Sequence, residues 1–191
     1  MTSIKRLCVY CGSFDAMYRD AARELGAALA AAGIELVYGG GRIGLMGVVA
    51  DAVLAGGGRA IGIIPAHLHD KEVGHSGLSQ LLVVGSMHER KRVMFEMSDA
   101  FAVLPGGLGT LDEAFEMITW KQLRLHDKPI LIVNVGGYWD KLLGLIEHVI
   151  ESGFARPGIR RHFHVVDRIE DVVPALRRAH QPAVEAKPDL V

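Results

Sequence analysis

Short runs of consecutive apolar residues alternate along the chain with longer segments in which apolar residues recur at helical spacing. The short runs are rich in β-branched residues, which is typical of strands buried on both faces of a parallel sheet. They predict strands at Leu7–Tyr10, Ile34–Tyr38, Ala60–Ile64, Leu81–Val84, Ala100–Leu104, Ile130–Val133 and His164–Val166. The longer segments predict helices at roughly Tyr18–Ala32, Gly44–Ala55, Met87–Met97, Thr110–Leu123, Tyr138–Glu151 and Glu170–Ala179.

Strands that alternate with helices predict repeated strand–helix–strand units, and therefore a parallel sheet. We expect an α/β fold of the Rossmann-like, doubly wound type, with helices on both faces of the sheet. One such domain is expected to span residues 1–180. The stretch 181–191 has two prolines and no periodic pattern, so it is expected to be a loose tail.

The composition narrows the class of protein. The chain has 191 residues, of which 50% are hydrophobic, and this excludes a disordered or fibrous protein. Its 21 Lys and Arg residues nearly balance its 22 Asp and Glu residues, so no overall basic field favours nucleic acid. The start of the chain lacks a signal-peptide pattern, and no apolar run approaches the roughly 20 residues of a membrane span. We expect a cytoplasmic protein that handles a small molecule, with no nucleic-acid or membrane partner.

Two glycine clusters each lie between a predicted strand and a predicted helix. In an open parallel sheet, ligands bind at the carboxyl ends of the strands, where glycines let the backbone approach a phosphate. The first cluster includes Gly40 and Gly41, and a tight turn remains an alternative for it. Gly12 and Ser13, after the first strand, are expected at the rim of the same crevice. The second cluster gives the stronger signal and predicts phosphate contacts from Gly106, Gly107, Gly109 and Thr110.

These loops do not match the common nucleotide motifs. No acidic residue follows the strand after the first cluster, although a dinucleotide site needs one for the ribose hydroxyls. No Gly-Lys-Ser/Thr follows the second cluster, so a Walker A loop is absent. Dinucleotide binding and nucleoside triphosphate hydrolysis are therefore disfavoured.

Glu113 and Glu116 lie one helical turn apart, on a predicted face that also carries Met117 and Trp120. The opposite stripe, which is expected to face the core, consists of Leu111, Ala114, Phe115 and Ile118. Two carboxylates at this spacing repel each other, and folding alone gives no reason for that cost beside a glycine loop. Paired carboxylates suit glycosidic bond cleavage, which passes through an oxocarbenium cation. A capping box formed by Thr110 and Glu113 is the structural alternative.

Arg90 lies on the stripe of its helix that is expected to pack against the body of the protein. A lone guanidinium there is costly without an anion, so Arg90 is a candidate ligand for a phosphate or a transition state. Arg92 and Glu96 are expected to form a solvated ion pair on the other side of the helix, and the role of Lys91 stays ambiguous.

Two further groups are weaker candidates. Cys8 and Cys11 match a C-x-x-C pattern, but Cys8 lies inside a strand and the chain has no other cysteine, so redox and zinc roles are disfavoured. His67, His69 and His75 lie in a polar stretch and are expected in a solvated loop rather than at a metal. No metal or cofactor is expected.

Ser86–Lys91 together with Pro105–Glu113 resembles the Lonely Guy (LOG) family of cytokinin riboside 5′-monophosphate phosphoribohydrolases, which are often labelled lysine decarboxylases. The family motif PGGxGTxxE is present without departure, and Tyr10–Ser13 and Tyr38–Gly41 are also similar to its nucleotide loops. The resemblance covers roughly residues 4–180. It implies a Rossmann-like homodimer that cleaves the N-glycosidic bond of adenine-type nucleoside 5′-monophosphates. In that family the Arg of the M-H-x-R-K motif and the Glu that ends PGGxGTxxE are catalytic, and these correspond here to Arg90 and Glu113. We also expect Met87, Arg90 and Lys91 to contact the substrate.

In this interpretation the 5′-phosphate lies against Gly107–Thr110, and Glu113, in the first turn of its helix, is ionised and stabilises the ribosyl cation. Glu116 supports it by holding a ribose hydroxyl or the base edge. The helical face that carries Glu113 and Trp120 is expected to form a two-fold dimer contact near the site. An AMP nucleosidase and a non-catalytic nucleotide or cofactor carrier remain alternatives. A pyridoxal-phosphate decarboxylase is rejected, because Lys91 is the only lysine near the crevice.

Overall fold

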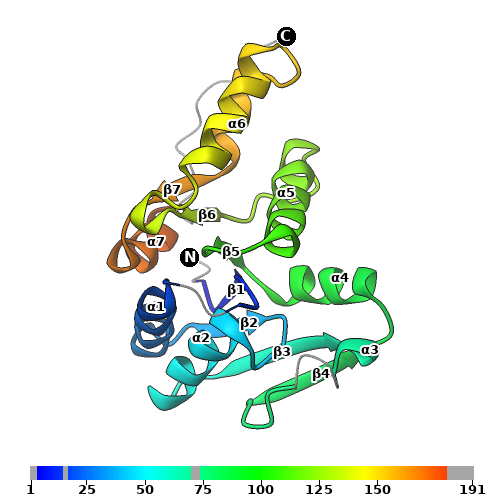
Figure 1. Cartoon of the computed structure of the whole chain (residues 1–191), viewed down its shortest axis with the longest axis vertical. Coiled ribbons are helices and arrows are strands. Elements are labelled where there is room, and N and C mark those ends of the chain that lie inside the picture. The colour runs from blue at the N-terminus through cyan, green and yellow to red at the C-terminus, as the bar shows by residue number, and fades with distance from the viewer. Residues whose placement is uncertain (1–3, 15–16, 70–73, 180–191) are drawn as a thin grey trace.

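The computed structural model describes residues 4–14, 17–69 and 74–179, and its centre is one sheet of seven strands. Every pair of neighbouring strands is parallel, in the order β4-β3-β2-β1-β5-β6-β7. The strands are β1 (Arg6–Tyr10), β2 (Glu35–Tyr38), β3 (Ala60–Pro65), β4 (Gln80–Val84), β5 (Ala100–Val103), β6 (Ile130–Val133) and β7 (His164–Val166). The predicted parallel α/β architecture is confirmed (Figure 1).

Helices cover both faces of this sheet, as the sequence predicts. The helices are α1 (Arg19–Ala32), α2 (Gly44–Ala55), α3 (Ala66–His69), α4 (Met87–Met97), α5 (Leu108–Gln122), α6 (Asp140–Glu151) and α7 (Val172–Ala179), with 3₁₀ turns η1 (Val135–Gly137), η2 (Pro157–His162) and η3 (Ile169–Asp171). Helices α1, α2 and α7 lie on one side of the sheet, and α4 and α5 lie on the other (Figure 1). Within the described residues, no helix is long and apolar enough to cross a membrane.

The core explains why the strands read as continuous apolar runs. In β1, Leu7 and Val9 pack in the layer that contains α1 and α2, whereas Cys8 and Tyr10 pack in the layer that contains α4 and α5. All four side chains are buried, because successive residues of a strand point to opposite faces of the sheet and both faces are covered.

Helix α5 begins earlier than the sequence predicts. Its first residue is Leu108 and its N-cap is Gly107, so Thr110 is already inside the helix. The capping box of Thr110 and Glu113, which was the structural alternative for these residues, is therefore not formed. The chain turns into the helix directly after its glycines, and these carry no side chain that could cap it. The short helix α3 is not predicted either, and the expected tail 181–191 lies outside the described residues.

The direction in which the chain adds strands to the sheet reverses between β1 and β5. From β1 the chain proceeds outward through β2, β3 and β4 on one side, and from β5 through β6 and β7 on the other. Ligands of such sheets bind at this switch point, beyond the carboxyl ends of the strands. The loops there are joined by backbone hydrogen bonds of 3.0 Å from Gly12 N to Pro105 O and from Leu45 N to Gly12 O. The loops after β1, β2 and β5 are thus held together.

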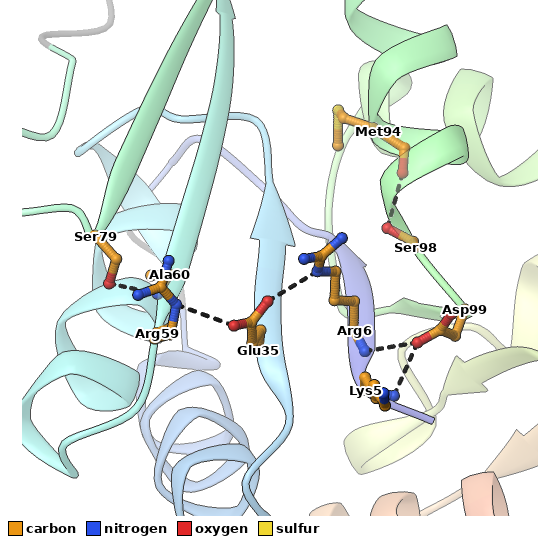
Figure 2. A network of polar contacts seen from close by, with 9 residues as sticks. All are labelled: Lys5, Arg6, Glu35, Arg59, Ala60, Ser79, Met94, Ser98 and Asp99. Atoms are coloured by element: carbon orange, nitrogen blue, oxygen red, sulfur yellow. Dashed lines mark hydrogen bonds and ion pairs between the residues drawn. The ribbon is translucent and has the colours of Figure 1, made fainter. Parts of the chain in front are cut away.

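Ion pairs tie together the opposite, amino ends of the central strands (Figure 2). Glu35 accepts from Arg6 at 2.8 Å and lies 2.9 Å from Nε of Arg59, while Asp99 accepts from the backbone N–H groups of Lys5 and Arg6. The Arg6 and Arg59 side chains are about half exposed, so each ion pair is worth at most about 1 kcal/mol. This end of the sheet carries structural contacts, and the carboxyl end carries the cavity described next.

Candidate functional site

A cavity of about 270 Å³ opens at the carboxyl ends of β1 and β5. Its walls come from the loops after β1, β2 and β5, and from α2, α4 and α5. The candidate residues that line it are Gly12, Ser13, Met87, Arg90, Gly107, Gly109, Thr110 and Glu113. Its volume is close to the lower end of the range for small-molecule sites, about 300–1,000 Å³. The structure therefore brings residues from distant parts of the sequence into one concave site.

The amino end of α5 faces this cavity. Gly107 is the N-cap and no side chain caps the helix, while Leu108, Gly109 and Thr110 are its first three residues. The N–H groups of these residues have no partner within the helix, and all three residues line the cavity. Because the helix dipole also places partial positive charge here, this end of the cavity suits a phosphate or another anion.

Helix α4 places Arg90 in the wall of the cavity. The helix start is set by Ser86, which accepts from Glu89 N at 3.1 Å, and by Glu89, which accepts from Gly85 N at 2.7 Å. Arg90 is only 6% exposed. This confirms the prediction that its side chain lies on the packed stripe.

The partners of Arg90 are weak acceptors for a buried cation. Its Nη2 donates to the carbonyl oxygen of Gly39 at 3.0 Å, and its Nη1 lies 3.8 Å from the sulfur of Met87. Its Nε is buried and has no hydrogen-bond partner among the described residues. Gly39 allows this arrangement, since a Cβ there would overlap Nη2. A guanidinium held in this way favours an anionic ligand in the cavity.

Glu113 and Glu116 have different surroundings. Glu113 lines the cavity, whereas Glu116 lies outside its lining and pairs with Lys91 at 3.1 Å. Lys91 also pairs with Asp112 at 3.2 Å. Burial alone would lower the pKa of Lys91, but its ion pairs with Glu116 and Asp112 outweigh this effect and raise it. The expected repulsion between Glu113 and Glu116 is therefore offset by Lys91.

The early start of α5 changes two further expectations. Glu113 is the sixth residue of the helix, so the prediction that it lies in the first turn is wrong. The buried stripe runs through Thr110, Ala114, Met117 and Ile118, so Met117 faces the core and not a partner, whereas Phe115 is 38% exposed. The helix is rotated relative to the expected orientation, because it packs on the sheet through this stripe.

The remaining glycine candidates do not line the cavity, but they form contacts within the loops that surround it. The carbonyl of Gly40 accepts from His75 N at 3.2 Å, and Gly41 forms an isolated bridge with Gly74. The carbonyl of Gly106 accepts a hydrogen bond from Tyr138. In this structure these glycines support the loops whose neighbours line the cavity.

The histidine cluster is only partly the solvated loop that the sequence predicts. His67 is exposed and His69 is half-buried, but His75 is buried and lies 2.8 Å from Asp51, so the prediction is wrong for His75. Nδ1 of His75 accepts a hydrogen bond from Gly77 N, while Nε2 contacts Asp51, so the ring links this polar stretch to α2. Among the described residues, no three His, Cys, Asp or Glu side chains form a group that could hold a metal ion.

Cys8 and Cys11 are free and buried. Burial is the main cause that raises the pKa of both thiols, and the carboxylate of Glu113 raises them further. Each thiol therefore stays protonated at neutral pH, which makes it a poor nucleophile and a poor redox centre.

Several residues that line the cavity are not among the candidate site residues predicted from the sequence. They are Val9, Tyr10, Cys11, Phe14, Gly39, Met46, Met94, Leu108 and Asp112. Most of them end or directly follow a strand, or lie next to a predicted residue, so their position in the sequence could have identified them as lining residues. Met46 and Met94 had no such signal, because only the packing of α2 and α4 brings them to the cavity.

Comparisons with known proteins identify relatives of this chain. The family model described as "Possible lysine decarboxylase" matches residues 46–176. A protein of Oryza sativa subsp. japonica named "Probable cytokinin riboside 5′-monophosphate phosphoribohydrolase" is 48% identical over 180 residues, which cover 89% of this chain and 79% of that protein. A cytokinin riboside 5′-monophosphate phosphoribohydrolase of Arabidopsis thaliana is 45% identical over 183 residues, which cover 91% of this chain and 86% of that protein.

Solved structures extend the likeness of the fold. A molybdenum cofactor binding protein from Rippkaea orientalis superposes with a TM-score of 0.69 at 18% identity, over 93% of this chain and 97% of that chain. A Moco carrier protein from Chlamydomonas reinhardtii has a TM-score of 0.69 at 19% identity, over 92% of this chain and 97% of that chain. At these identities the likeness concerns the fold alone. Because its relatives are more than 40% identical over most of its length and the family model also matches, the chain belongs to the family of the cytokinin riboside 5′-monophosphate phosphoribohydrolases.

Proposed function

We propose that this protein hydrolyses the N-glycosidic bond of cytokinin riboside 5′-monophosphates and releases the N6-substituted adenine and ribose 5-phosphate. One observation carries the proposal: a single cavity holds the uncapped amino end of α5 and the buried Arg90 together with the carboxylate of Glu113. Such a site can bind a phosphate and can also stabilise a sugar cation. The names of the family's members, which state this reaction, support the proposal.

The phosphate would bind at the amino end of α5. There the N–H groups of Leu108, Gly109 and Thr110 have no partner within the helix, and Thr110 adds a hydroxyl. Arg90, whose Nε has no partner among the described residues, would contact the phosphate or the leaving base. Binding energy at this remote group can then be used at the reacting centre.

Glu113 would act on the ribose. The bond from C1′ to N9 breaks with its electrons going to the base, and the oxygen of a water molecule forms a bond to C1′. One proton of this water is lost and one proton is taken up by the base. A carboxylate at the cavity wall stabilises the oxocarbenium character at C1′ and orients the water. Glu116 lies outside the lining, so we now assign it to holding Lys91 rather than to contacting the ribose or the base.

The surroundings of Lys91 argue against lysine decarboxylation. A pyridoxal-phosphate enzyme needs a lysine whose amine can lose its proton and form a Schiff base. Lys91 is instead held between Asp112 and Glu116, which raise its pKa and stabilise the charged form. The decarboxylase description of the family model therefore does not suit the chemistry of these residues.

We also infer a homodimer whose contact lies beside the cavity. Four large apolar side chains on α5 and just after it are exposed, namely Leu108, Phe115, Leu123 and Leu125. Apolar groups gathered on one surface mark protein interfaces, and two copies of one face can pair about a two-fold axis. Leu108 also lines the cavity, so the contact would adjoin the site. We place the protein in the cytoplasm, where Cys8 and Cys11 would remain reduced.

Chromatography of products tests the reaction. The protein is incubated with N6-isopentenyladenosine monophosphate, with AMP and with the two corresponding nucleosides. We expect free base and ribose 5-phosphate from the N6-substituted monophosphate, and no base from either nucleoside. Release from AMP alone would indicate an AMP nucleosidase, and unchanged peaks throughout would indicate a carrier. Cleavage of nucleosides as readily as monophosphates would contradict the phosphate contact.

A further inference from the structure

We propose that Tyr138 is a positioning residue for the phosphate end of the site. Its hydroxyl holds the peptide between Gly106 and Gly107 in the orientation that directs the N–H of Gly107 into the cavity. This inference rests on the proposed function, because it concerns how the same site binds its phosphate. Tyr138 lies outside the glycine motif, 32 residues after Gly106.

The geometry starts from one hydrogen bond. The Tyr138 hydroxyl donates to the carbonyl oxygen of Gly106 at 2.7 Å. A peptide group is planar, and in a trans peptide the C=O and the following N–H point in opposite directions. The described residues contain no cis peptide bond. The N–H of Gly107 therefore points away from Tyr138, and Gly107 lines the cavity while Gly106 does not.

This peptide needs support from outside the loop. It joins two glycines, and glycine has few steric barriers to rotation of the flanking dihedral angles. Gly106 is tightly enclosed, because a Cβ there would overlap the hydroxyl oxygen of Thr110 and would lie 2.9 Å from the backbone nitrogen of Gly12. Neither glycine has a side chain that could hold this peptide, so contacts to the backbone must hold it, and the Tyr138 hydroxyl makes one of these.

The turn that presents Tyr138 is itself well held. Asn134 is buried, its side-chain oxygen accepts from Trp139 N at 2.7 Å, and its side-chain amide donates to Asp140 at 2.9 Å. Trp139 is 3% exposed, and its indole N–H donates to the carbonyl of Val103, at the end of β5, at 3.3 Å. Residues on both sides of Tyr138 are thus anchored to the sheet. The hydroxyl is delivered from a rigid support, as a positioning role requires.

A second aromatic ring limits the orientation of Tyr138. The ring of Tyr18, just before α1, packs edge-on against it with centroids 5.2 Å apart and an interplanar angle of 76°. The two tyrosines form one aromatic pair, but it is the hydroxyl of Tyr138 that donates the hydrogen bond to Gly106. Tyr18→Phe is therefore a matched control for Tyr138→Phe, since each change removes one hydroxyl from the pair.

Calorimetric titration tests the inference with AMP, ribose 5-phosphate and adenine as probes. For Tyr138→Phe we expect the Kd of AMP and of ribose 5-phosphate to rise about threefold to tenfold, the effect of one hydrogen bond. The Kd of adenine should stay unchanged, and KM for the monophosphate should rise while kcat changes by less than about twofold. Tyr18→Phe should bind all three probes as the wild type does. Unchanged Kd values for AMP and ribose 5-phosphate, or an equal loss for adenine, would overturn the positioning role.

The titration separates this inference from the proposed reaction. A wild-type protein that binds AMP without releasing adenine or N6-substituted base would contradict the proposed function, while the comparison of Kd values would still decide the role of Tyr138. If the wild type turns over the monophosphate and Tyr138→Phe has the same Kd values as the wild type, the positioning role of Tyr138 is contradicted and the proposed reaction is still supported. A wild type that binds neither AMP nor ribose 5-phosphate would contradict both.

Discussion

Nη2 of Arg90 donates a hydrogen bond to the carbonyl oxygen of Gly39 at 3.0 Å, across 51 residues of sequence. The bond joins α4 to the loop after β2, and it fixes a guanidinium in the wall of the cavity. A lysine at this position could not reproduce it together with the contact of Nη1 to Met87, because an ammonium is a single charged group and not a planar fork.

Arg90→Lys is therefore expected to lower kcat/KM for the nucleoside monophosphate by about 10- to 100-fold, the range for one or two hydrogen bonds of a charged group. Steady-state kinetics would measure this loss. Arg92→Lys is the matched control, since Arg92 is exposed and pairs with Glu96 on the outer side of the same helix. Equal activity of both variants would show that Arg90 serves packing only.

Glu113→Gln keeps the shape of the side chain and removes its charge. If the carboxylate stabilises the sugar cation, kcat should fall by about 10²–10³, or roughly 3–4 kcal/mol. The Kd of AMP should change little or become lower, because a carboxylate in the same cavity repels the phosphate in the ground state. Kinetics and nucleotide titration of the variant would check both parts, and a near wild-type kcat would exclude the catalytic role.

The same change at Glu116 should have a weaker effect. Glu116 is outside the cavity lining and paired with Lys91, so Glu116→Gln is expected to lower kcat by less than about tenfold. Assays of the two variants under one set of conditions give the comparison. A larger loss for Glu116→Gln than for Glu113→Gln would reverse the assignment of the two carboxylates.

His126 is expected to make the fold sensitive to acid. Its Nε2 lies 3.0 Å from the carbonyl of Met117, and its Nδ1 accepts from the backbone N–H of Lys128 at 3.1 Å, so the ring is neutral. Burial lowers its pKa, with further lowering by Lys121 and Lys128, and together these outweigh the hydrogen bond to Met117 and the charge of Asp127, which raise it. The unfolded chain then binds a proton that the folded protein does not, so this stability is complete above about pH 6.5 and is lost below it.

Urea unfolding between pH 7.5 and pH 5 would measure this loss. His126→Asn supplies an oxygen that can accept from Lys128 and cannot take up the proton, so its free energy of unfolding should decrease less than that of the wild type over this range. His164→Asn is the control, because His164 is exposed. A decrease for His126→Asn as steep as for the wild type would assign the acid sensitivity to other groups.

The proposed dimer predicts a charge-sensitive contact on α5. Phe115→Glu places a carboxylate on the exposed apolar surface of this helix, which should convert a dimer to a monomer at micromolar concentration. Sedimentation velocity would measure the change. Val83→Glu alters an exposed apolar residue on the edge strand β4 and should leave the dimer intact. A wild type that sediments only as a monomer would contradict the inference.

The pattern of apolar residues along the chain was enough to predict most of the strands and helices. Continuous apolar runs such as Ile130–Val133 are strands because they fill both layers of a covered parallel sheet. Chain topology then sends the loops after β1, β2 and β5 to one end of the sheet, so the sequence also predicted that Gly12 and Thr110 would lie near each other. The burial of Arg90 was predicted from helical spacing alone.

The surroundings of individual charges needed the tertiary structure. Spacing placed Glu113 and Glu116 on one helical face, but only the packing of α4 beside α5 brings Lys91 to Glu116 and leaves Glu113 at the cavity. Likewise, the burial of His75 depends on Asp51, and the hydrogen bond of Tyr138 depends on Gly106. The sequence by itself determined the seven strands, the six long helices, their order along the chain and the loops that meet, because these follow from the period of apolar residues. The partners of each polar group were decided by tertiary packing, because they come from elements whose relative rotation no local pattern specifies.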